Sequence, residues 1–546
     1  MDFAQLELTL NTEMVAAPTL GAFTPLRERV FLVLWVATVA ANVGTWMRDT
    51  ASGWLMTSLA PSPTLVALVQ AATTLPMFLL ALPAGALSDI VDRRRLMIII
   101  QFGLAAVSLA LGLMTQFGLM TPYILLALTF CGGIGAALAA PAWQAVVPEL
   151  VPRSMLRPAV ALNSLGTNIA RAIGPALGGL IIATLGTAMT YYADVASYAL
   201  IIGALVWWRR DAAPVERPER LIGAMRAGVR FTWHQPHLKR VLLRAFLFFV
   251  GASCYWALLP LIVRVQLKGD ATAYGLSMTA IGCGAIAGAL VLPRVRRHFS
   301  SNTVVLFGAL LTAATTAALA VATAVPQGIA ALFFAGLAWI AVLTLLNASA
   351  QSVLPNWVRG RGLALYLTVF FGAMTLGSFL WGRVASIESI PVALFAAGAT
   401  TAVLAVLAHR WTLPEQEADL TPSLHWPEPA LPHELTADAG PVMVRIVYNI
   451  PPARHAEFRA AMNDLAQIRR RDGAYAWGLM FNMERRAEVT EWFLVESWEE
   501  HLRQHHRIAK VDREVQERAV KLHAGDQPPR VEHHLDLQFS AVTAAD

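Results

Sequence analysis

Four ionisable residues lie inside segments that are otherwise strongly apolar, and they are the first candidates for chemistry in this sequence. Arg48 and Asp49 are adjacent in one apolar segment, and Arg171 and Asp194 lie in two later ones. A charge within a membrane is costly unless it meets a partner or water, so such residues often mark a transport pathway. The set carries no net charge, which predicts an ion-pair network around a central cavity and a carboxylate that binds a proton. A static structural ion pair is the alternative.

Polar and aromatic side chains at similar depth extend this candidate site into a surface for a substrate. Aromatic rings recognise large, partly apolar ligands through contact area and stacking. Helix packing and anchoring at the membrane interface are the alternative roles for each side chain taken singly. The candidates are Gln70, Trp143, Gln144, Asn168, Trp256, Asn347 and Gln351, with Asn42 and Trp46 close to Arg48 in the sequence.

Other kinds of chemistry find little support. The three cysteines lie in apolar segments at no metal spacing. His501 and His505 share a helical face, as a metal pair would, but charged residues surround them and no third ligand follows by spacing. The sequence contains no Gly-x-x-x-x-Gly-Lys phosphate loop. We therefore expect no metal, no cofactor and no enzymatic activity, and an ion gradient as the energy source.

The elements that position these residues are predicted to be membrane helices. Of the 546 residues, 56% are hydrophobic and only 14% are charged, whereas soluble domains have about 25% charged residues. A helix needs about 20 apolar residues to cross the bilayer core. Apolar runs predict twelve spans, at 30–58, 64–84, 96–116, 122–146, 157–184, 187–208, 240–265, 272–293, 303–324, 328–352, 362–385 and 390–410.

Arginines are concentrated in alternate loops, and this asymmetry orients the spans. The predicted loops near 61, 118, 186 and 326 contain no arginine, whereas the loops between them do. The exceptions are Arg264, Lys268 and Arg383. By the positive-inside rule, both termini are expected in the cytoplasm. Membrane topology thus explains the net charge of +6 better than nucleic-acid binding does.

The chain divides at a basic connector and at a proline-rich linker. In the connector, Leu221, Met225, Val229 and Trp233 form a stripe typical of an amphipathic helix on a membrane surface. The connector separates two sets of six spans, as in transporters built from two repeated halves. The predicted units are an N-terminal segment 1–26, a six-helix bundle 27–208, the connector 209–239, a second six-helix bundle 240–411, the linker 412–440 and a soluble domain 441–538.

The soluble domain is predicted to be α+β. Strands are expected at 442–450, 475–483, 488–496 and 530–537, with charged helices at 452–471 and 498–522. This βαββαβ order is that of a ferredoxin-like domain. The segment from Trp498 to His505 resembles the dimeric α/β-barrel group that includes the antibiotic-biosynthesis monooxygenases. That resemblance implies a dimerisation or regulatory module, with a cargo-modifying enzyme as the alternative.

The stretch 85–95 connects the second and third spans. We expect a tight, charged hairpin in which Gly85 lets backbones approach closely and Asp89 pairs with cations or a helix N-terminus. The Gly-x-Leu-x-Asp spacing followed by Arg93 and Arg94 resembles the loop 2–3 signature of the major facilitator superfamily. Two signature positions differ, because Ile90 replaces an arginine and Asp92 replaces a glycine. An ordinary positive-inside loop is the alternative.

A second motif lies in the fifth span. Glycines permit close helix contact, and a proline removes a helix hydrogen bond. The run contains Gly174, Pro175, Gly178 and Gly179 and resembles the second half of the superfamily's exporter signature. Together with 168–175 and 355–362, it makes the chain resemble the transmembrane secretion effector branch, which includes the enterobactin exporter. The resemblance extends from about 25 to 540 and implies export.

The resemblance also implies a gate. The Asp of loop 2–3 is thought to face the start of helix 11, so Asp89 would meet the helix start near Gly362, and Arg93 would pair with Glu149. Breaking these contacts would open the inner side of the transporter.

These observations lead to one expected function. The chain is expected to export a small amphipathic molecule, such as a siderophore, an antibiotic or a drug, across the bacterial inner membrane by proton-coupled alternating access. Its expected partners are the substrate, protons and the lipid bilayer, with homodimerisation through the soluble domain. An importer of the same fold and an exporter with a tail enzyme are the alternatives, since fold alone does not determine direction.

Overall fold

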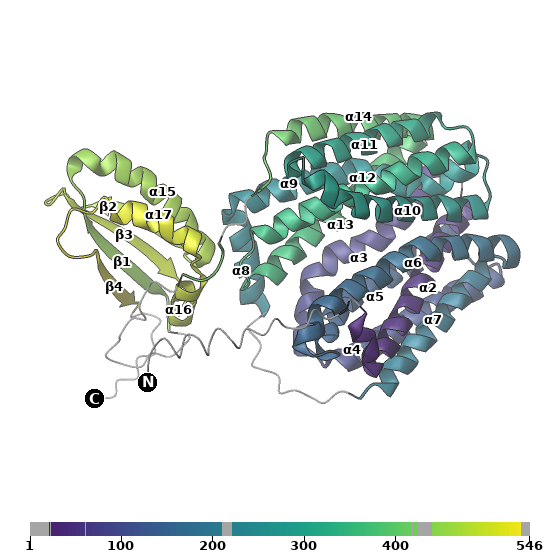
Figure 1. The fold of residues 1–546 in the computed structure, drawn as a ribbon, viewed down its shortest axis with the longest axis horizontal. Coiled ribbons are helices and arrows are strands. Elements are labelled where there is room, and N and C mark those ends of the chain that lie inside the picture. Colours follow the sequence, from purple (N-terminus) through teal and green to yellow (C-terminus); the bar gives the residue numbers. More distant parts are fainter. Residues whose placement is uncertain are drawn as a thin grey trace.

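The chain forms a long helical part and a small sheet domain, as Figure 1 shows. The structure is a computed structural model that describes residues 21, 23–60, 62–209, 221–415, 419–423 and 439–536. The sheet domain lies beside one end of the helical part (Figure 1). We call this the tail-side end, and the opposite end the distal end.

Twelve helices in the described residues are long and apolar enough to cross a membrane, as predicted. Each coincides with one predicted span to within a few residues. They are α2 (Arg29–Leu59), α3 (Pro63–Ile90), α4 (Arg93–Gln116), α5 (Pro122–Val146), α6 (Leu156–Leu185), α7 (Thr187–Trp207), α9 (Pro236–Leu261), α10 (Ala271–Arg296), α11 (Ser301–Val321), α12 (Val325–Ser352), α13 (Arg359–Ile387) and α14 (Ile390–His409).

The twelve helices form two halves, α2–α7 and α9–α14, which lie one above the other in Figure 1. Within the first half, α2 packs on α6 and α7, and α3 packs on α5. Within the second, α9 packs on α13, and α10 packs on α12. The halves meet mainly where α3 lies against α13 and α6 lies against α10. Any site shared by the two halves must therefore lie along this seam.

The stretch 85–95 is more helical than a hairpin loop. Helix α3 continues to Ile90 and α4 already begins at Arg93, because the Asp92 side chain caps α4 by accepting a hydrogen bond from the backbone N–H of Arg95 at 2.8 Å. A Cβ placed on Gly85 would meet no atom within 4 Å in the described structure. The close backbone approach expected at Gly85 stays a prediction.

The connector contains the predicted amphipathic helix, α8 (Leu221–His234). Val229 and Trp233 of the predicted stripe are exposed, whereas the side chains of Leu221 and Met225 lie outside the described residues. Phe231, which the stripe did not include, is buried on α8. Residues 210–220 and most of the N-terminal segment 1–26 lie outside the described residues, apart from a short helix, η1 (Thr24–Arg27).

Shorter helical turns join several of the long helices. In the first half they follow α5 and precede α6, and in the second half a π-helix follows α9. They are η2 (Val147–Glu149), η3 (Arg153–Met155) and η4 (Ile262–Gln266).

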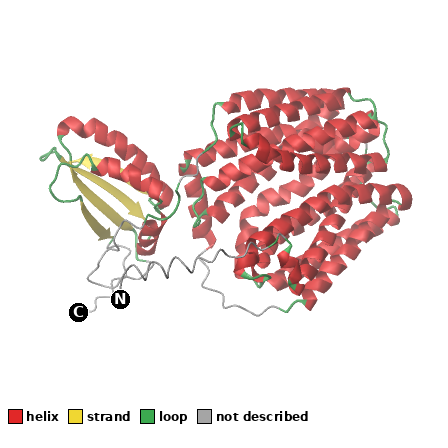
Figure 2. Cartoon of the chain, viewed as in Figure 1, coloured by secondary structure: helices red, strands yellow, loops and turns green. Residues whose placement is uncertain are grey.

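The sheet domain contains four antiparallel strands, drawn yellow in Figure 2, in the order β2-β3-β1-β4, with the labels of Figure 1. Alternate residues of β1 and β3 are buried on one face of the sheet. They form the core of the domain together with helix residues such as Phe458 and Leu465. The elements are β1 (Val442–Asn449), η5 (Pro452–Arg454), α15 (His455–Asp472), β2 (Ala476–Phe481), β3 (Glu488–Val495), α16 (Trp498–Arg507), α17 (Lys510–Val520) and β4 (Arg530–Leu535).

The helix predicted at 498–522 is wrong in one respect, since it is divided into α16 and α17. The break occurs at Ala509, whose backbone N–H donates to Asp512 Oδ2 at 3.0 Å. Ala509 also forms an isolated bridge with Pro422 of the linker. These contacts use backbone groups that a continuous helix would have paired internally. The rest of the proline-rich linker lies largely outside the described residues.

Candidate functional site

Arg48 and Asp194 form an ion pair inside the first half. Arg48 Nη1 lies 3.5 Å from Asp194 Oδ2 and donates to Tyr198 Oη at 2.9 Å. Asp194 also accepts a 2.6 Å hydrogen bond from Ser108 Oγ on α4. Arg48 is 6% exposed and Asp194 is 0% exposed. The pair therefore joins α2 to α7 in a dry environment, where each charge depends on its partners.

Asp49 takes the other side of the same guanidinium. Its Oδ1 lies 3.2 Å from Arg48 Nη2, but the Asp49 side chain is 33% exposed. Asp49 lies one helical turn before Gly53, where a Cβ would come within 2.9 Å of Tyr274 Oη on α10. This face of α2 therefore points toward the second half. Arg48 thus forms ion pairs with a buried acid inside the first half and with a partly exposed acid at the seam.

Arg171 does not join this network in the described structure. Its guanidinium lies 5.7 Å from the ring centroid of Trp46, in a cation–π arrangement, and its Nε makes no hydrogen bond there. In the sequence, Arg171 shares only its expected depth in the membrane with Arg48, Asp49 and Asp194. Depth does not specify the face of α6 on which a side chain lies.

The glycine motif of α6 packs on two helices at once. Cβ atoms on Gly174 and Gly178 would come within 2.6 Å of Trp46 Cβ and 3.1 Å of Met47 Cα on α2. A Cβ on Gly179 would lie 2.6 Å from the Ala271 carbonyl oxygen on α10, and one on Gly275 would lie 2.5 Å from the Pro175 carbonyl oxygen. The predicted close helix contact is confirmed, and it crosses the seam between the halves.

The distal end of the seam is closed by polar contacts as well. Arg264, in the π-helix η4, donates to Thr57 Oγ1 on α2 at 2.8 Å and to Ser58 Oγ. Its guanidinium also lies 5.3 Å from the ring centroid of Trp54. Thr64 Oγ1 on α3 donates to the Gly382 carbonyl on α13 at 3.3 Å. Sequence reasoning missed Arg264, although its position as an exception to the positive-inside rule was a signal.

The proposed substrate surface falls into separate groups. Trp256 on α9 lies 5.5 Å from Trp339 on α12, measured between ring centroids, and Phe370 on α13 also contacts Trp339 at 6.2 Å. This aromatic group belongs to the second half, and Trp339 and Phe370 were not among the candidates. Hydrophobicity alone did not distinguish these two rings from ordinary core residues.

Most of the remaining candidates form hydrogen bonds with residues nearby in the sequence. Asn347 Oδ1 accepts from Gln351 Nε2 at 2.8 Å, one turn along α12, and Asn168 Nδ2 donates to the Ser164 carbonyl within α6. Trp143 Nε1 donates to Asn163 Oδ1 at 2.8 Å. Gln70 on α3 is half-buried and Gln144 on α5 is exposed. The structure therefore does not bring the whole predicted set into one cluster.

At the tail-side end, Arg93 pairs with Glu149, with Nη1 and Oε1 2.7 Å apart, which is the contact expected from sequence. Arg94 donates to the carbonyls of Leu205 and Val206, each at 2.8 Å, and so holds the end of α7 within the first half. The Asp89 side chain lies outside the described residues, and so does its expected contact near Gly362. Gating roles for these residues stay predictions.

The sheet domain is docked on the second half through α8. Arg230 on α8 lies 2.6 Å from Glu500 on α16. The Arg507 guanidinium lies 4.4 Å from the ring centroid of Trp357, just before α13, and that of Arg471 lies 5.5 Å from the ring centroid of Phe231. Within the sheet domain, Glu500 also binds Arg507 at 2.6 Å. None of these contacts was predicted, because they join segments far apart in sequence.

Two six-helix halves with buried charges beside their seam define a multi-pass membrane transporter of the secondary type. A sequence profile of the family described as "Transmembrane secretion effector" matches residues 20–540, so the chain belongs to that family, a branch of the major facilitator superfamily. The family assignment makes it a transporter and not an enzyme. It is a membrane protein with twelve spans.

Individual relatives and solved structures agree with this assignment. The Staphyloferrin A transporter of Staphylococcus aureus (strain NCTC 8325 / PS 47) is 25% identical over 47% of this chain and 65% of its own length. The Multidrug efflux pump Tap of Mycolicibacterium fortuitum is 24% identical over 70% of this chain and 95% of its own. A POT family transporter in complex with 5-aminolevulinic acid has a TM-score of 0.60 at 12% identity, over 71% of this chain and 97% of that chain, which shows the shared fold.

Proposed function

We propose that this protein exports a small amphipathic molecule, such as a siderophore or a drug, across the bacterial inner membrane in exchange for protons. The names of its relatives support export, as does the glycine motif of α6. The arginines at the tail-side end support placing that end, and both termini, in the cytoplasm. Trp256 and Phe370, half-buried beside the buried Trp339, would supply an apolar surface on the second half for such a substrate.

The observation that carries the proposal is the closed distal end of the seam. Gly179 meets α10, and Arg264 bridges from the second half to α2. Each of these contacts joins the first half to the second, so a rocking motion of the two halves would break both contacts together. That is the arrangement expected of alternating access, in which contacts at one end are exchanged for contacts at the other.

Proton coupling is assigned to Asp49. It is the acid of the network that is partly exposed on the face of α2 directed at the seam, whereas Asp194 is enclosed by Ser108, Tyr198 and Arg48. Protonation of Asp49 would release one side of Arg48 while Asp194 still holds the other. Asp194 then acts as a fixed counter-ion rather than as a proton carrier.

The tail-side gate is assigned to the motif around Asp89. In this proposal Asp89 meets the start of α13 when the tail-side end closes, and the Arg93–Glu149 pair keeps the ends of α4 and α5 together. Asp89→Asn is then expected to favour the state open to the cytoplasm and to slow transport without lowering expression. Unchanged reactivity of a cysteine placed in the cytoplasmic cavity would contradict this role.

Metabolite profiling tests direction and substrate together. Cells that lack the protein should accumulate its substrate inside and release less of it, and cells that regain the wild type should release it again. An importer, the alternative function, would instead show lower uptake from the medium in the deletion strain. Proton-driven transport of the compound so identified, in vesicles made with the purified protein, then tests coupling.

For the sheet domain we propose regulation of the transporter and pairing with a second copy. Its order of strands and helices supports a ferredoxin-like domain. Its contacts with Phe231 and Trp357 support regulation, since they hold α8 and the start of α13 in one unit. Met443, Trp492 and Leu494 alternate with core residues of β1 and β3 and so lie on the opposite face of the sheet. Light scattering on the wild type and Trp492→Arg would test pairing through that face.

A further inference from the structure

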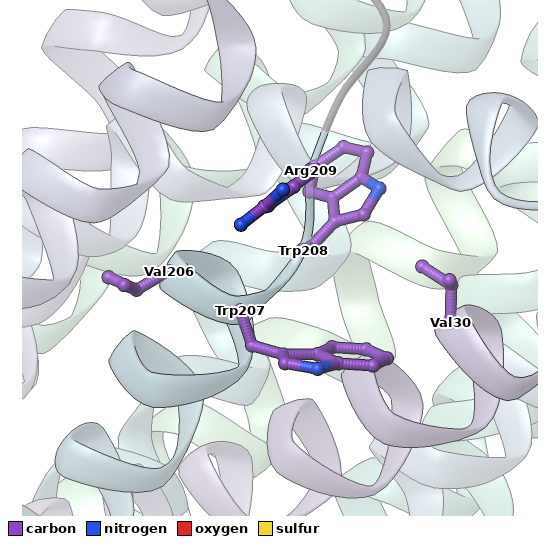
Figure 3. Close-up of a pocket in the computed structure, with 5 residues that line it drawn as sticks. All are labelled: Val30, Val206, Trp207, Trp208 and Arg209. Carbon is purple, nitrogen blue, oxygen red and sulfur yellow. The ribbon is translucent and has the colours of Figure 1, made fainter.

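A cavity opens at the tail-side end between the start of α2 and the end of α7. It has a volume of about 510 Å³ and is lined by Val30, Val206, Trp207, Trp208 and Arg209. Figure 3 shows the ring of Trp207 extending toward Val30, with Trp208 and Arg209 on the segment that follows α7. The cavity lies far along α2 and α7 from Arg48 and Asp194, so it is separate from the proposed coupling site.

Positive charge surrounds this cavity. Arg209 lines it, and the Arg29 guanidinium lies 5.8 Å from the ring centroid of Trp207. Arg94 adds a third cation at the end of α7, where it satisfies the carbonyls of Leu205 and Val206. Glu28 precedes Arg29, but none of the described residues that line the cavity is acidic. The site therefore suits an anion rather than a neutral or zwitterionic group.

An apolar stripe leads away from the cavity along the outside of α7. Leu200, Val206 and Trp207 are exposed, with Val206 at 55% and Trp207 at 47%. Gly203 lies between them on the same face, and a Cβ there would meet nothing within 4 Å. On a helix that crosses a bilayer, an exposed apolar stripe of this kind contacts acyl chains. Indole rings at helix ends commonly lie at the level of the lipid headgroups.

We propose that this cavity binds an anionic phospholipid, with the phosphate between Arg29 and Arg209 and an acyl chain along the α7 stripe. Charge complementarity selects the headgroup, and the continuous apolar stripe selects a lipid over a soluble anion. Basic pockets between membrane helices are known to recognise anionic headgroups in this way. The proposal needs only that the helix ends lie at the headgroup level, so it does not depend on the direction of transport.

Native mass spectrometry of the full chain tests the site with phosphatidylglycerol and phosphatidylcholine of identical acyl chains. Wild type should retain phosphatidylglycerol preferentially. The double variant Arg29→Gln/Arg209→Gln should bind it roughly 30-fold more weakly, from the usual contribution of two basic residues at a membrane surface. The matched control is Arg296→Gln/Arg297→Gln, which removes two exposed arginines at the tail-side end of α10 and should leave binding within about twofold.

Two further arms distinguish the outcomes. Val30→Trp fills the cavity while keeping every arginine, so it should also weaken phosphatidylglycerol binding, and it provides a second test if the double variant does not fold. Excess inorganic phosphate should not displace the lipid. Equal retention of both lipids, an equal loss in the control variant, or displacement by phosphate would each overturn the proposal. Metabolite export is measured separately, so failure of this site would leave the proposed transport function standing.

Discussion

Arg48 on α2 and Asp194 on α7 are 146 residues apart in sequence, yet their side chains lie 3.5 Å apart in the interior of the first half. Asp49 binds the same guanidinium from the side that faces the second half. The two acids therefore share a cation but differ in burial. This difference separates a structural role from a transport role and leads to the first prediction.

Asp194→Asn is expected to destabilise the protein, and Asp49→Asn is expected to uncouple it. Loss of the Asp194 charge leaves Arg48 buried with weaker partners, which should cost roughly 2–3 kcal/mol of unfolding free energy. Asp49 is partly exposed, so its change should alter stability little but remove the dependence of transport on a proton gradient. Thermal unfolding in detergent and transport in vesicles check both. A stable Asp194→Asn protein that is uncoupled would reverse the two assignments.

Gly179→Val should prevent the distal end from closing. A Cβ at Gly179 would lie 2.6 Å from the Ala271 carbonyl oxygen, a backbone atom that cannot rotate away. We expect at least about tenfold slower transport, as for a misplacement of about 1 Å at a working site, and higher reactivity of a cysteine introduced at the distal end of the seam. Gly103→Ala on α4 is the control, because a Cβ there meets nothing within 4 Å. Normal reactivity in Gly179→Val would argue against closure at this contact.

Arg264→Ala should loosen the same end by a different route. The substitution removes hydrogen bonds to Thr57 and Ser58 and the contact with the ring of Trp54. Together such contacts contribute roughly 2 kcal/mol, which would shift the population toward the distal-open state about 30-fold. Accessibility of the distal cysteine measures the shift. Arg383→Ala removes another arginine predicted at the distal end and should have no comparable effect.

A cross-link between the sheet domain and α8 should slow transport. His234 Nδ1 on α8 lies 3.3 Å from Gln467 Oε1 on α15, so a reducible bis-thiol cross-linker can join cysteines at these positions in a protein whose three native cysteines have been replaced. Because undocking is expected to accompany the transport cycle, cross-linking should lower the rate and reduction of the linker should restore it. Each single cysteine variant is the control. A cross-linked protein that transports at the full rate would show that the docked domain does not restrain the transporter.

The sheet domain should lose stability as pH falls below about 6.5. Burial, followed by the neighbouring His533 and His505, lowers the pKa of His501 to about 3. Between that value and the unfolded value of about 6.5, the unfolded chain binds a proton that the folded domain does not. The unfolding free energy therefore falls by about 1.4 kcal/mol per pH unit as pH decreases through this window. Above the unfolded pKa, the domain keeps its full stability.

Hydrogen exchange of α16 in the full chain, corrected for the intrinsic rate, measures this slope between pH 7 and pH 5. His501→Gln should flatten it. His298→Gln removes an exposed histidine after α10 and should leave it unchanged. A wild-type domain with no slope in this range would show that His501 already carries its proton when folded.

Two differences between the sequence interpretation and the structure have a common physical origin. Arg171 and Arg48 are expected at similar depth, but Arg171 lies on a face of α6 that packs against Trp46. The helix expected at 498–522 breaks because Ala509 bonds to Asp512 and to the linker. In each case a contact between separate segments outweighed a local preference. The Arg93–Glu149 pair was predictable because both residues end neighbouring spans at the same side.

The twelve spans, the two halves, the strand order along the tail and the glycine motif followed from the sequence itself. They depend on the length of apolar runs, on alternation and on small side chains, which are local properties of the chain. Only the tertiary structure decided that Arg48 pairs with two acids of different burial and that Arg264 closes the distal end. It also decided that Phe231 and Trp357 contact the sheet domain. Those relationships arise because helix packing brings together side chains that no spacing rule connects, and the free energy of a buried charge depends on the neighbours it finds there.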